Sequence, residues 1–185
     1  MRVIAGTARS VPLLSREGLD TRPTSDRVKE AVFNIIQFEL EGRSVLDLFG
    51  GSGQMAIEAL SRGAKDAVIV DQSRDSVSII RQNLKKTRLE AQAEPICSDY
   101  MDYLNRTNKR FDLVFLDPPY HQKFLENALN KISEIDILKS GAIIVCERPS
   151  EKSLPDRYGG LRRIKDYRYG RTGITLYRAV DSSER

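Results

Sequence analysis

The sequence contains no tryptophan, one histidine and two cysteines among its 185 residues. The single histidine, His121, is not part of any Ser-His-Asp or Cys-His pattern, which argues against those hydrolase classes. No CxxC pair or Cys/His cluster is present, so neither a zinc site nor any other metal cofactor is expected. Cys97 and Cys146 stand in apolar, strand-like runs, and we predict that both are reduced core residues.

Long apolar segments are also missing from the chain. No run approaches the roughly 20 residues that a membrane span needs, and the first residues are too polar for the core of a signal peptide. We therefore expect a cytoplasmic protein with no membrane partner. Forty per cent of the residues are apolar, which is enough for one core. No apolar surface stripe is left over, so we expect a monomer.

The charge is uneven along the chain, whose formal net charge is +4. Between Arg157 and Arg178 the basic residues face a single acid, Asp166, and tyrosines are interleaved with them. A basic, tyrosine-bearing flank is typical of a surface that binds a polyanion such as nucleic acid. A solvated charged surface with no partner is the alternative interpretation.

Short apolar runs alternate with helical patterns through the centre of the chain. Strands are predicted at 44–49, 67–71, 93–98, 111–116 and 141–147. Helices are predicted at about 27–40, 54–62, 73–88 and 123–134, with Ser73 capping the third. Because the strands are apolar almost throughout, they indicate a parallel sheet covered on both faces.

The two ends of the chain differ from this centre. Residues 161–169 and 172–179 read as two strands joined by a Gly-rich turn, which predicts an antiparallel hairpin at the edge of the sheet. Residues 1–24 are punctuated by Gly, Arg and Pro, and we expect a small extension there, with a short hairpin, before a main domain over 25–185. The expected fold is Rossmann-like, with a mostly parallel seven-stranded sheet.

A glycine loop follows the first predicted strand. Asp47 precedes Gly50, Gly51 and Gly53, and Asp71 ends the next strand twenty residues after Gly51. Glycines let the backbone approach a ligand, and a carboxylate at the position of Asp71 can accept from ribose hydroxyls. Neither GxGxxG nor a P-loop is present, and Asp47 would repel a pyrophosphate. These features favour a nucleoside cofactor with a cationic group and no phosphate, such as S-adenosylmethionine.

The tetrapeptide Asp-Pro-Pro-Tyr at residues 117–120 follows the fourth predicted strand. Proline has no backbone N–H and forces the chain out of the sheet, so Asp117, Pro118 and Pro119 present oxygen acceptors beside the ring of Tyr120. Acceptors beside a stacking ring suit a nucleobase that carries an amino group. A plain strand-ending turn with a surface tyrosine is the alternative.

These motifs together resemble the RsmD family of bacterial 16S rRNA guanine-N2 methyltransferases, whose members have the Rossmann fold and use S-adenosylmethionine. The stretches that carry the resemblance are 1–6, 22–34, 46–49, 58–64 and 111–120. The resemblance implies methyl transfer to the N2 amine of one guanosine in 16S rRNA, naked or within the assembling 30S subunit. Gly51 departs from the family pattern, in which alanine is expected.

The resemblance also implies roles for individual residues. Four would form the catalytic site: Asp117, Pro118, Pro119 and Tyr120. Those expected to contact the cofactor are Asp47, Phe49, Gly50, Gly51, Gly53, Asp71, Gln72, Asp99 and Tyr100, and Asp99 would accept from the adenine amine. Thr24 and Arg27 are also expected to contact the cofactor, because they lie where the helix before the first strand approaches it. RNA contacts are expected from Arg9, Arg22, Arg168 and Arg171.

Two other functions remain open at this point. A DNA adenine-N6 methyltransferase uses the same Asp-Pro-Pro-Tyr chemistry, although the chain has little room for a target-recognition domain. A non-catalytic RNA-binding module on the same fold is the second alternative, and intact cofactor and tetrad motifs argue against it. A protein-glutamine methyltransferase would favour Asn at the position of Asp117.

Overall fold

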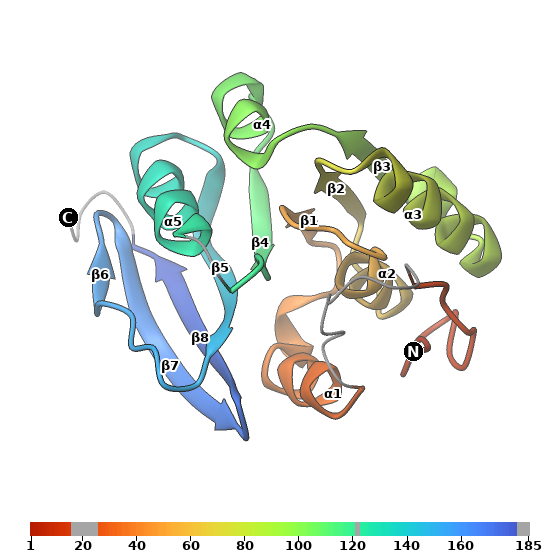
Figure 1. Cartoon of the computed structure of the whole chain (residues 1–185), viewed down its shortest axis with the longest axis horizontal. Coiled ribbons are helices and arrows are strands. Elements are labelled where there is room, and N and C mark those ends of the chain that lie inside the picture. The colour runs from red at the N-terminus through yellow and green to blue at the C-terminus, as the bar shows by residue number, and fades with distance from the viewer. Residues whose placement is uncertain (16–25, 121–122, 181–185) are drawn as a thin grey trace.

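A computed structural model describes residues 1–15, 26–120 and 123–180 of the chain. Within these residues, one eight-stranded sheet has the order β3-β2-β1-β4-β5-β8-β7-β6 (Figure 1). The strands are β1 (Ser44–Asp47), β2 (Asp66–Asp71), β3 (Ala93–Cys97), β4 (Phe111–Leu116), β5 (Leu138–Pro149), β6 (Arg157–Tyr158), β7 (Leu161–Tyr169) and β8 (Thr172–Ala179). The first five strands pair in parallel, and the last three join the sheet in antiparallel pairs.

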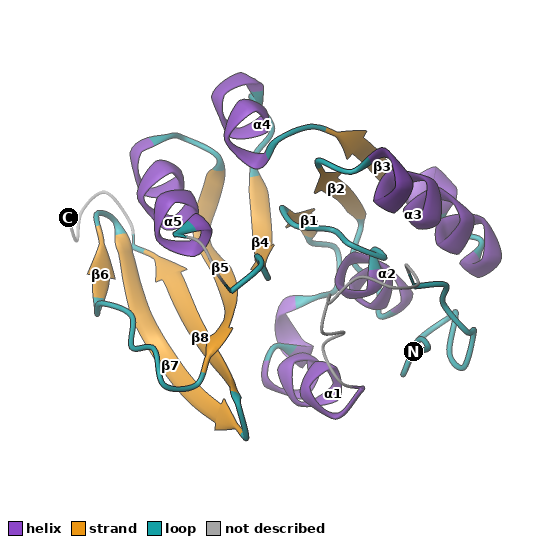
Figure 2. Cartoon of the chain, in the orientation of Figure 1, coloured by secondary structure: helices purple, strands orange, loops and turns teal. Residues whose placement is uncertain are grey.

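Helices cover both faces of this sheet (Figure 2). The α-helices are α1 (Asp26–Ile35), α2 (Gln54–Ser61), α3 (Arg74–Thr87), α4 (Tyr100–Arg106) and α5 (Phe124–Glu134), and the 3-10 helices are η1 (Gln37–Glu39) and η2 (Glu90–Gln92). One hydrophobic cluster joins α1, α2 and α3 to the sheet. A second joins α4 and α5 to the opposite face. The Rossmann-like architecture predicted from the alternating pattern is therefore confirmed.

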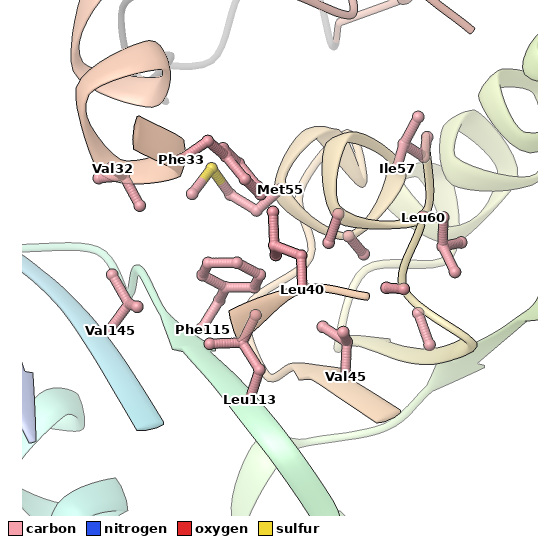
Figure 3. Packing of buried hydrophobic residues seen from close by; sticks show 14 of the residues in the cluster. Val32, Phe33, Leu40, Val45, Met55, Ile57, Leu60, Leu113, Phe115 and Val145 are labelled. Carbon is pink, nitrogen blue, oxygen red and sulfur yellow. The ribbon is translucent and has the colours of Figure 1, made fainter. Parts of the chain in front are cut away.

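The core beneath α1 and α2 holds the first face of the sheet in place. Phe33 of α1 packs against Phe115 of β4, with ring centroids 5.7 Å apart. Met55 of α2 and Val145 of β5 belong to the same cluster as these two rings (Figure 3). Alternate residues of β4 point to opposite faces, so Val114 belongs to the other cluster. Because both faces are buried, the central strands read as continuous apolar runs.

Two elements were not expected from the sequence. The sheet has eight strands where seven were predicted, because the two-residue strand β6 is too short to produce a pattern. Helix α4 follows β3 directly, and its cap is Asp99, whose Oδ1 accepts from the backbone N–H of Met101 at 2.8 Å and of Asp102 at 3.3 Å. The predicted strand 93–98 is one residue too long, since β3 stops at Cys97.

The placement of the cysteines corrects another prediction. Cys146 is buried in β5, as expected, but Cys97 is exposed. The reason is the topology: β3 is an edge strand of the sheet, and its last residue lacks a neighbour on one side.

Helix α1 is shorter than the predicted helix 27–40, because it ends at Ile35 and the chain continues only as the 3-10 turn η1. The Ser73 cap of α3 is confirmed, with Oγ accepting from the Ser76 N–H at 3.3 Å.

The first fifteen residues fold back on themselves and pack on α2 and α3. Arg2 and Pro12 form an isolated antiparallel bridge, and Val3, Ala8 and Leu13 enter the same core cluster as α1 and α2. In the described part of the chain, no helix is long and apolar enough to cross a membrane.

Candidate active site

The carboxyl ends of the parallel strands bring the predicted site residues to one edge of the sheet. Asp47 ends β1 and Asp71 ends β2, while Asp117 directly follows β4. Because β1 pairs with both β2 and β4, the three acids lie on adjacent strands at the same edge. Ligands of open α/β sheets bind at the carboxyl ends of the strands, which is this edge.

The glycine loop between β1 and α2 is tightly closed. A Cβ atom on Gly50 would lie 2.6 Å from Cγ2 of Ile69, so only glycine fits there. Gly51 and Gly53 both have positive φ angles, of 56° and 79°, a conformation that glycine adopts without strain. The Gly51 N–H donates to Oδ2 of Asp71 at 2.8 Å, which ties the loop to the end of β2. The Ser73 N–H donates to the other oxygen of Asp71 at 2.8 Å.

Asp47 lies beneath this loop and is only 2% exposed. Burial, with a smaller contribution from the nearby Asp71, raises the pKa of its carboxyl to about 7 against the opposing effect of hydrogen bonds from the backbone N–H groups of Ala56 and Phe49. A buried carboxylate of this kind is stabilised by a neighbouring positive charge. The site is therefore electrostatically suited to a cation and unsuited to a phosphate.

Three aromatic rings stand beside the loop. Phe49 lies 5.1 Å from Tyr100 and 6.3 Å from Phe124, measured between ring centroids, and Tyr100 meets Phe124 edge-on at 5.5 Å. All three side chains are partly exposed. This cluster offers flat apolar surface at the same edge as Asp47 and Asp71, as a purine requires.

The Asp-Pro-Pro-Tyr segment forms the neighbouring part of the edge. Asp117 is half-buried, Pro118 is buried and Pro119 is exposed. The Tyr120 hydroxyl donates to Oε1 of Glu147 on β5 at 2.9 Å. Burial raises the pKa of Tyr120, and the adjacent Glu147 carboxylate raises it further, so the phenol stays protonated and remains a donor. A small cavity on the α1 side of the sheet is lined by both carboxylates, Asp117 and Glu147.

The remaining predicted residues have different surroundings. Gln72 is exposed after β2, and Arg27 is exposed in the first turn of α1. Thr24 and Arg22 lie outside the described residues, as does His121. Arg9, Arg168 and Arg171 are exposed. Arg9 belongs to the N-terminal segment and the other two to the β7–β8 hairpin, and α1 lies between these two regions in Figure 1.

Three residues of this region escaped the sequence reasoning. Glu147 ends an apolar run on the strand next to β4, the same signal that identified Asp47 and Asp71. Asn83 is a buried polar residue on the apolar stripe of α3: its Nδ2 donates to the carbonyls of Leu14 at 3.0 Å and Ser52 at 2.9 Å. Phe124 carried no signal, because its partners come from two other segments.

Clusters that could hold a metal ion are absent from the described residues: no group of three or more His, Cys, Asp or Glu side chains gathers there. The donor set at the sheet edge consists of single carboxylates, backbone amides and aromatic rings. This set fits an organic cation with a ribose and a purine.

Comparison with known proteins places this fold and site in a class. The solved structure of yhhF from Escherichia coli superposes with a TM-score of 0.88, is 30% identical, and covers 97% of this chain and 98% of its own. The chain also matches YlbH of Bacillus subtilis, at 38% identity over 96% of this chain and 98% of YlbH. The fold is that of a Rossmann-like methyltransferase.

Sequence comparison also identifies the family of the chain. A family model described as conserved hypothetical protein 95 matches residues 1–178. The ribosomal RNA small subunit methyltransferase D of Haemophilus influenzae is 36% identical, over 96% of this chain and 92% of its own length. The chain belongs to this family, the RsmD family, as the resemblance in the sequence indicated.

Proposed function

We propose that this protein transfers a methyl group from S-adenosylmethionine to the N2 amine of a guanosine in 16S ribosomal RNA. One observation carries the proposal: the anionic glycine loop after β1 and the Asp-Pro-Pro-Tyr segment after β4 stand on hydrogen-bonded neighbouring strands. A cofactor held by the first would face a base held by the second. The small-subunit rRNA methyltransferase name of its relative supports the choice of RNA.

The residues of the loop fit the cofactor. Asp71 would accept from the ribose hydroxyls and Asp47 would balance the positive charge, while Phe49 and Tyr100 would pack on the adenine. Asp99 is proposed to accept from the adenine amine in addition to capping α4. When bound, S-adenosylmethionine would supply a methyl group on a positively charged sulfur: the amine lone pair would form the new C–N bond while the C–S bond breaks, and neutral S-adenosylhomocysteine would leave.

The tetrad residues would orient the attacking amine. The guanine N2 lone pair is delocalised into the ring, so the nitrogen is a poor nucleophile until its N–H bonds are held. In this proposal the Asp117 carboxylate and the Pro118 carbonyl each accept one N–H, which directs the lone pair toward the methyl group. Tyr120 stacks on the base, a contact worth about 1–3 kcal/mol. Asp117 or water takes the proton that methylation releases.

The surroundings of the reaction follow from this substrate. The guanosine must be unstacked to reach the pocket, in an RNA loop or by flipping out of a helix. We propose that the protein acts in the cytoplasm on 16S rRNA, alone or within an assembling 30S subunit. We also propose that it acts as a monomer, since Phe38 and Leu14 are the exposed large apolar side chains among the described residues. Residues 1–24 would serve as an extension to a methyltransferase domain over 25–185.

The first experiment is transfer of labelled methyl from S-adenosylmethionine to naked 16S rRNA, partly assembled 30S subunits and duplex DNA. We expect label on one guanosine N2 in either RNA sample. The RNA sample that receives more labelled methyl identifies the substrate. Label on DNA adenine would instead favour an adenine-N6 methyltransferase. Tight cofactor binding with no transfer to any sample would favour a binding module.

Two substitutions separate the proposed roles. Asp117→Ala is expected to abolish transfer while cofactor affinity, measured by calorimetry, stays at the wild-type value. Asp71→Ala is expected to weaken cofactor affinity first, because two backbone amides and the ribose lose their acceptor. Loss of cofactor affinity in Asp117→Ala, or normal affinity in Asp71→Ala, would contradict these roles.

The raised pKa of Asp47 gives the proposal a pH signature. With a pKa of about 7, the carboxyl is mostly neutral at pH 6 and mostly ionised at pH 8. If Asp47 balances the cationic cofactor, affinity should rise about tenfold between these pH values. Asp47→Asn is the control, and its affinity should be low and flat over this range. A flat wild-type profile would remove Asp47 from the site.

A further inference from the structure

We infer that the β7–β8 hairpin docks the single-stranded RNA next to the target nucleotide, with Tyr169 and Tyr167 stacking on its bases and Arg171 near its phosphates. This inference rests on the proposed function and adds to it the surface that recognises the substrate.

Strand register places the hairpin tip beside the catalytic tetrad. Pro149, at the end of β5, pairs with Thr172 of β8, and Thr172 pairs with Tyr169 of β7. Tyr120 is hydrogen-bonded to Glu147 and has a further hydrogen-bonding interaction with the Thr172 side chain. One path therefore leads from the tetrad across the start of β8 to the end of β7.

The side chains on this path share one face of the sheet. Glu147 lies two residues after Val145 on β5, and Thr172 lies two residues before Ile174 on β8. Val145 and Ile174 both belong to the cluster on the α1 side, and strand residues two apart point the same way. Tyr167 and Tyr169 pack partly against that same cluster. The tyrosine pair and the tetrad thus open onto the same side of the molecule.

The two tyrosines form a small flat platform. Their ring centroids are 6.3 Å apart and their planes differ by 20°, so the rings are nearly parallel. Both side chains are half-buried, which fixes them on the strand while leaving part of each ring accessible. Rings of this kind are what single-stranded nucleic acid binds by stacking, whatever the base sequence.

The charge of the hairpin complements a polyanion. Arg168 and Arg171 are exposed at the tip, and Nε of Arg168 donates to the Gly170 carbonyl, which folds its side chain over the turn. The single acid of this hairpin, Asp166, is held by a two-point ion pair with Arg148 at 2.6 and 2.7 Å. Its charge is therefore compensated, and the tip presents positive charge beside the tyrosines.

The first test compares ring-removing and ring-keeping substitutions. Tyr169→Ala and Tyr167→Ala are expected to raise the KM for the RNA substrate about tenfold each, the equivalent of losing one stacked base. Cofactor affinity and kcat should stay at wild-type values. Tyr169→Phe and Tyr167→Phe keep the ring and should keep the KM. Tyr169→Leu keeps the packing without the ring, and it replaces the alanine variant if that variant unfolds at a lower temperature.

A charge control separates the tip from the rest of the hairpin. Arg171→Ala is expected to raise the RNA KM and to lower its salt dependence. Arg162→Ala removes one exposed charge from the other end of β7, opposite Arg178, and should change the KM much less. Equal effects of the two variants would mean that only the overall charge matters, which would overturn the docking surface.

A fluorescence reporter tests the contact directly, because the chain has no tryptophan. Tyr169→Trp gives a single reporter at the platform, and its emission should be quenched by single-stranded RNA fragments of the substrate. Phe38→Trp gives a matched reporter in η1 that is 91% exposed, and its emission should not change.

The outcomes distinguish this inference from the proposed function. If the wild type methylates RNA but the tyrosine variants keep its KM and Tyr169→Trp is not quenched, the surface is wrong and the function stands. If the tyrosine variants lose activity only on assembled 30S subunits and bind naked RNA normally, the hairpin docks a protein, and the inference fails. If the wild type transfers no methyl to RNA, both fail.

Discussion

Both flanks of the core sheet lie beside the candidate site, but they are attached to the sheet in different ways. The N-terminal segment, residues 1–15, is held by buried polar side chains that bond to its backbone. The β7–β8 hairpin is held by a regular ladder of backbone hydrogen bonds with β5. A ladder does not depend on side-chain identity, so the hairpin can vary its surface residues freely. The N-terminal attachment depends on a few residues of fixed chemistry.

Glu58 is the centre of the N-terminal attachment. It is fully buried on α2 and accepts from the backbone N–H groups of Ile4 at 2.8 Å and Ala5 at 3.0 Å. Arg62 donates to it at 2.8 Å, and the Lys29 ammonium lies 3.6 Å away. Lys29 in turn donates to the carbonyl of Arg2 at 2.5 Å. The backbone of the N-terminal segment, Arg62 and Lys29 thus all meet at the Glu58 carboxylate.

The largest effect should come from removing that carboxylate. Glu58→Ala leaves the buried Lys29 without its buried carboxylate partner and two amides without an acceptor, and it is expected to lower the free energy of unfolding by about 3–5 kcal/mol. Urea unfolding measures the change. Glu94→Ala, which breaks an exposed ion pair with Lys109, is the control and should cost about 0–1 kcal/mol. Similar losses in the two variants would show that the N-terminal attachment contributes little.

A pair of glycines compares the two flanks directly. Gly6 and Gly170 have positive φ angles of 83° and 60°, so alanine is strained at both. A Cβ at Gly6 would lie 1.7 Å from the Ser61 carbonyl oxygen, whereas one at Gly170 would meet nothing within 4 Å. Gly170→Ala should cost about 1–2 kcal/mol, and Gly6→Ala about 2–5 kcal/mol. Thermal unfolding of both variants tests this, and equal costs would contradict the close docking of Gly6.

Asn83 links the N-terminal segment to the cofactor loop, and its loss should be felt at both. Asn83→Ala removes the partners of the Leu14 N–H and carbonyl and of the Ser52 carbonyl. We expect a loss of about 1–3 kcal/mol in unfolding free energy together with weaker S-adenosylmethionine binding. Thr175→Val is the matched change in the hairpin, where Arg148 keeps its ion pair with Asp166. Calorimetry on that variant should give wild-type cofactor affinity.

The smallest expected effect is the loss of folding stability when Asp166 in the hairpin is protonated at low pH. Burial alone would raise the pKa of Asp166, but hydrogen bonds from Arg148 and Thr175 outweigh it and hold the pKa below its usual value. The ionised form therefore stabilises the fold above the unfolded pKa of about 3.9, and this contribution is lost as the pH falls through the folded pKa. Asp166→Asn should unfold earlier in urea than the wild type at pH 7, and the difference should shrink toward pH 3.

Local pattern was sufficient to predict most of the fold and much of the candidate site. The apolar runs predicted the parallel strands, because strands buried on both faces need apolar residues throughout. Asp47, Asp71 and Asp117 could be found because each follows such a run, and the carboxyl ends of parallel strands share one edge. Glu147 also ends an apolar run, but it was not predicted as a site residue because no recognisable motif adjoins it.

The errors have a common physical cause, which is dependence on partners distant in the sequence. Cys97 looked like a core residue, and only the order of strands shows that β3 is an edge. Lys29 and Asn83 are buried polar residues whose partners lie 27 and 69 positions away. No local window contains that information.

The neighbours Glu147 and Arg148 on β5 have a consequence for how the protein folds. Their side chains point to opposite faces: Glu147 reaches Tyr120, and Arg148 fills the space above Gly173, where a Cβ would lie 2.3 Å from Nη1. A slip of β5 by one residue would exchange the two, placing a guanidinium beside Tyr120 and a carboxylate against the opposite core. A molecule in which β5 has slipped by one residue would therefore lack the contact between Glu147 and Tyr120 altogether. The hydrogen bond between Tyr120 and Glu147 therefore requires β5 to be in its observed register with β8.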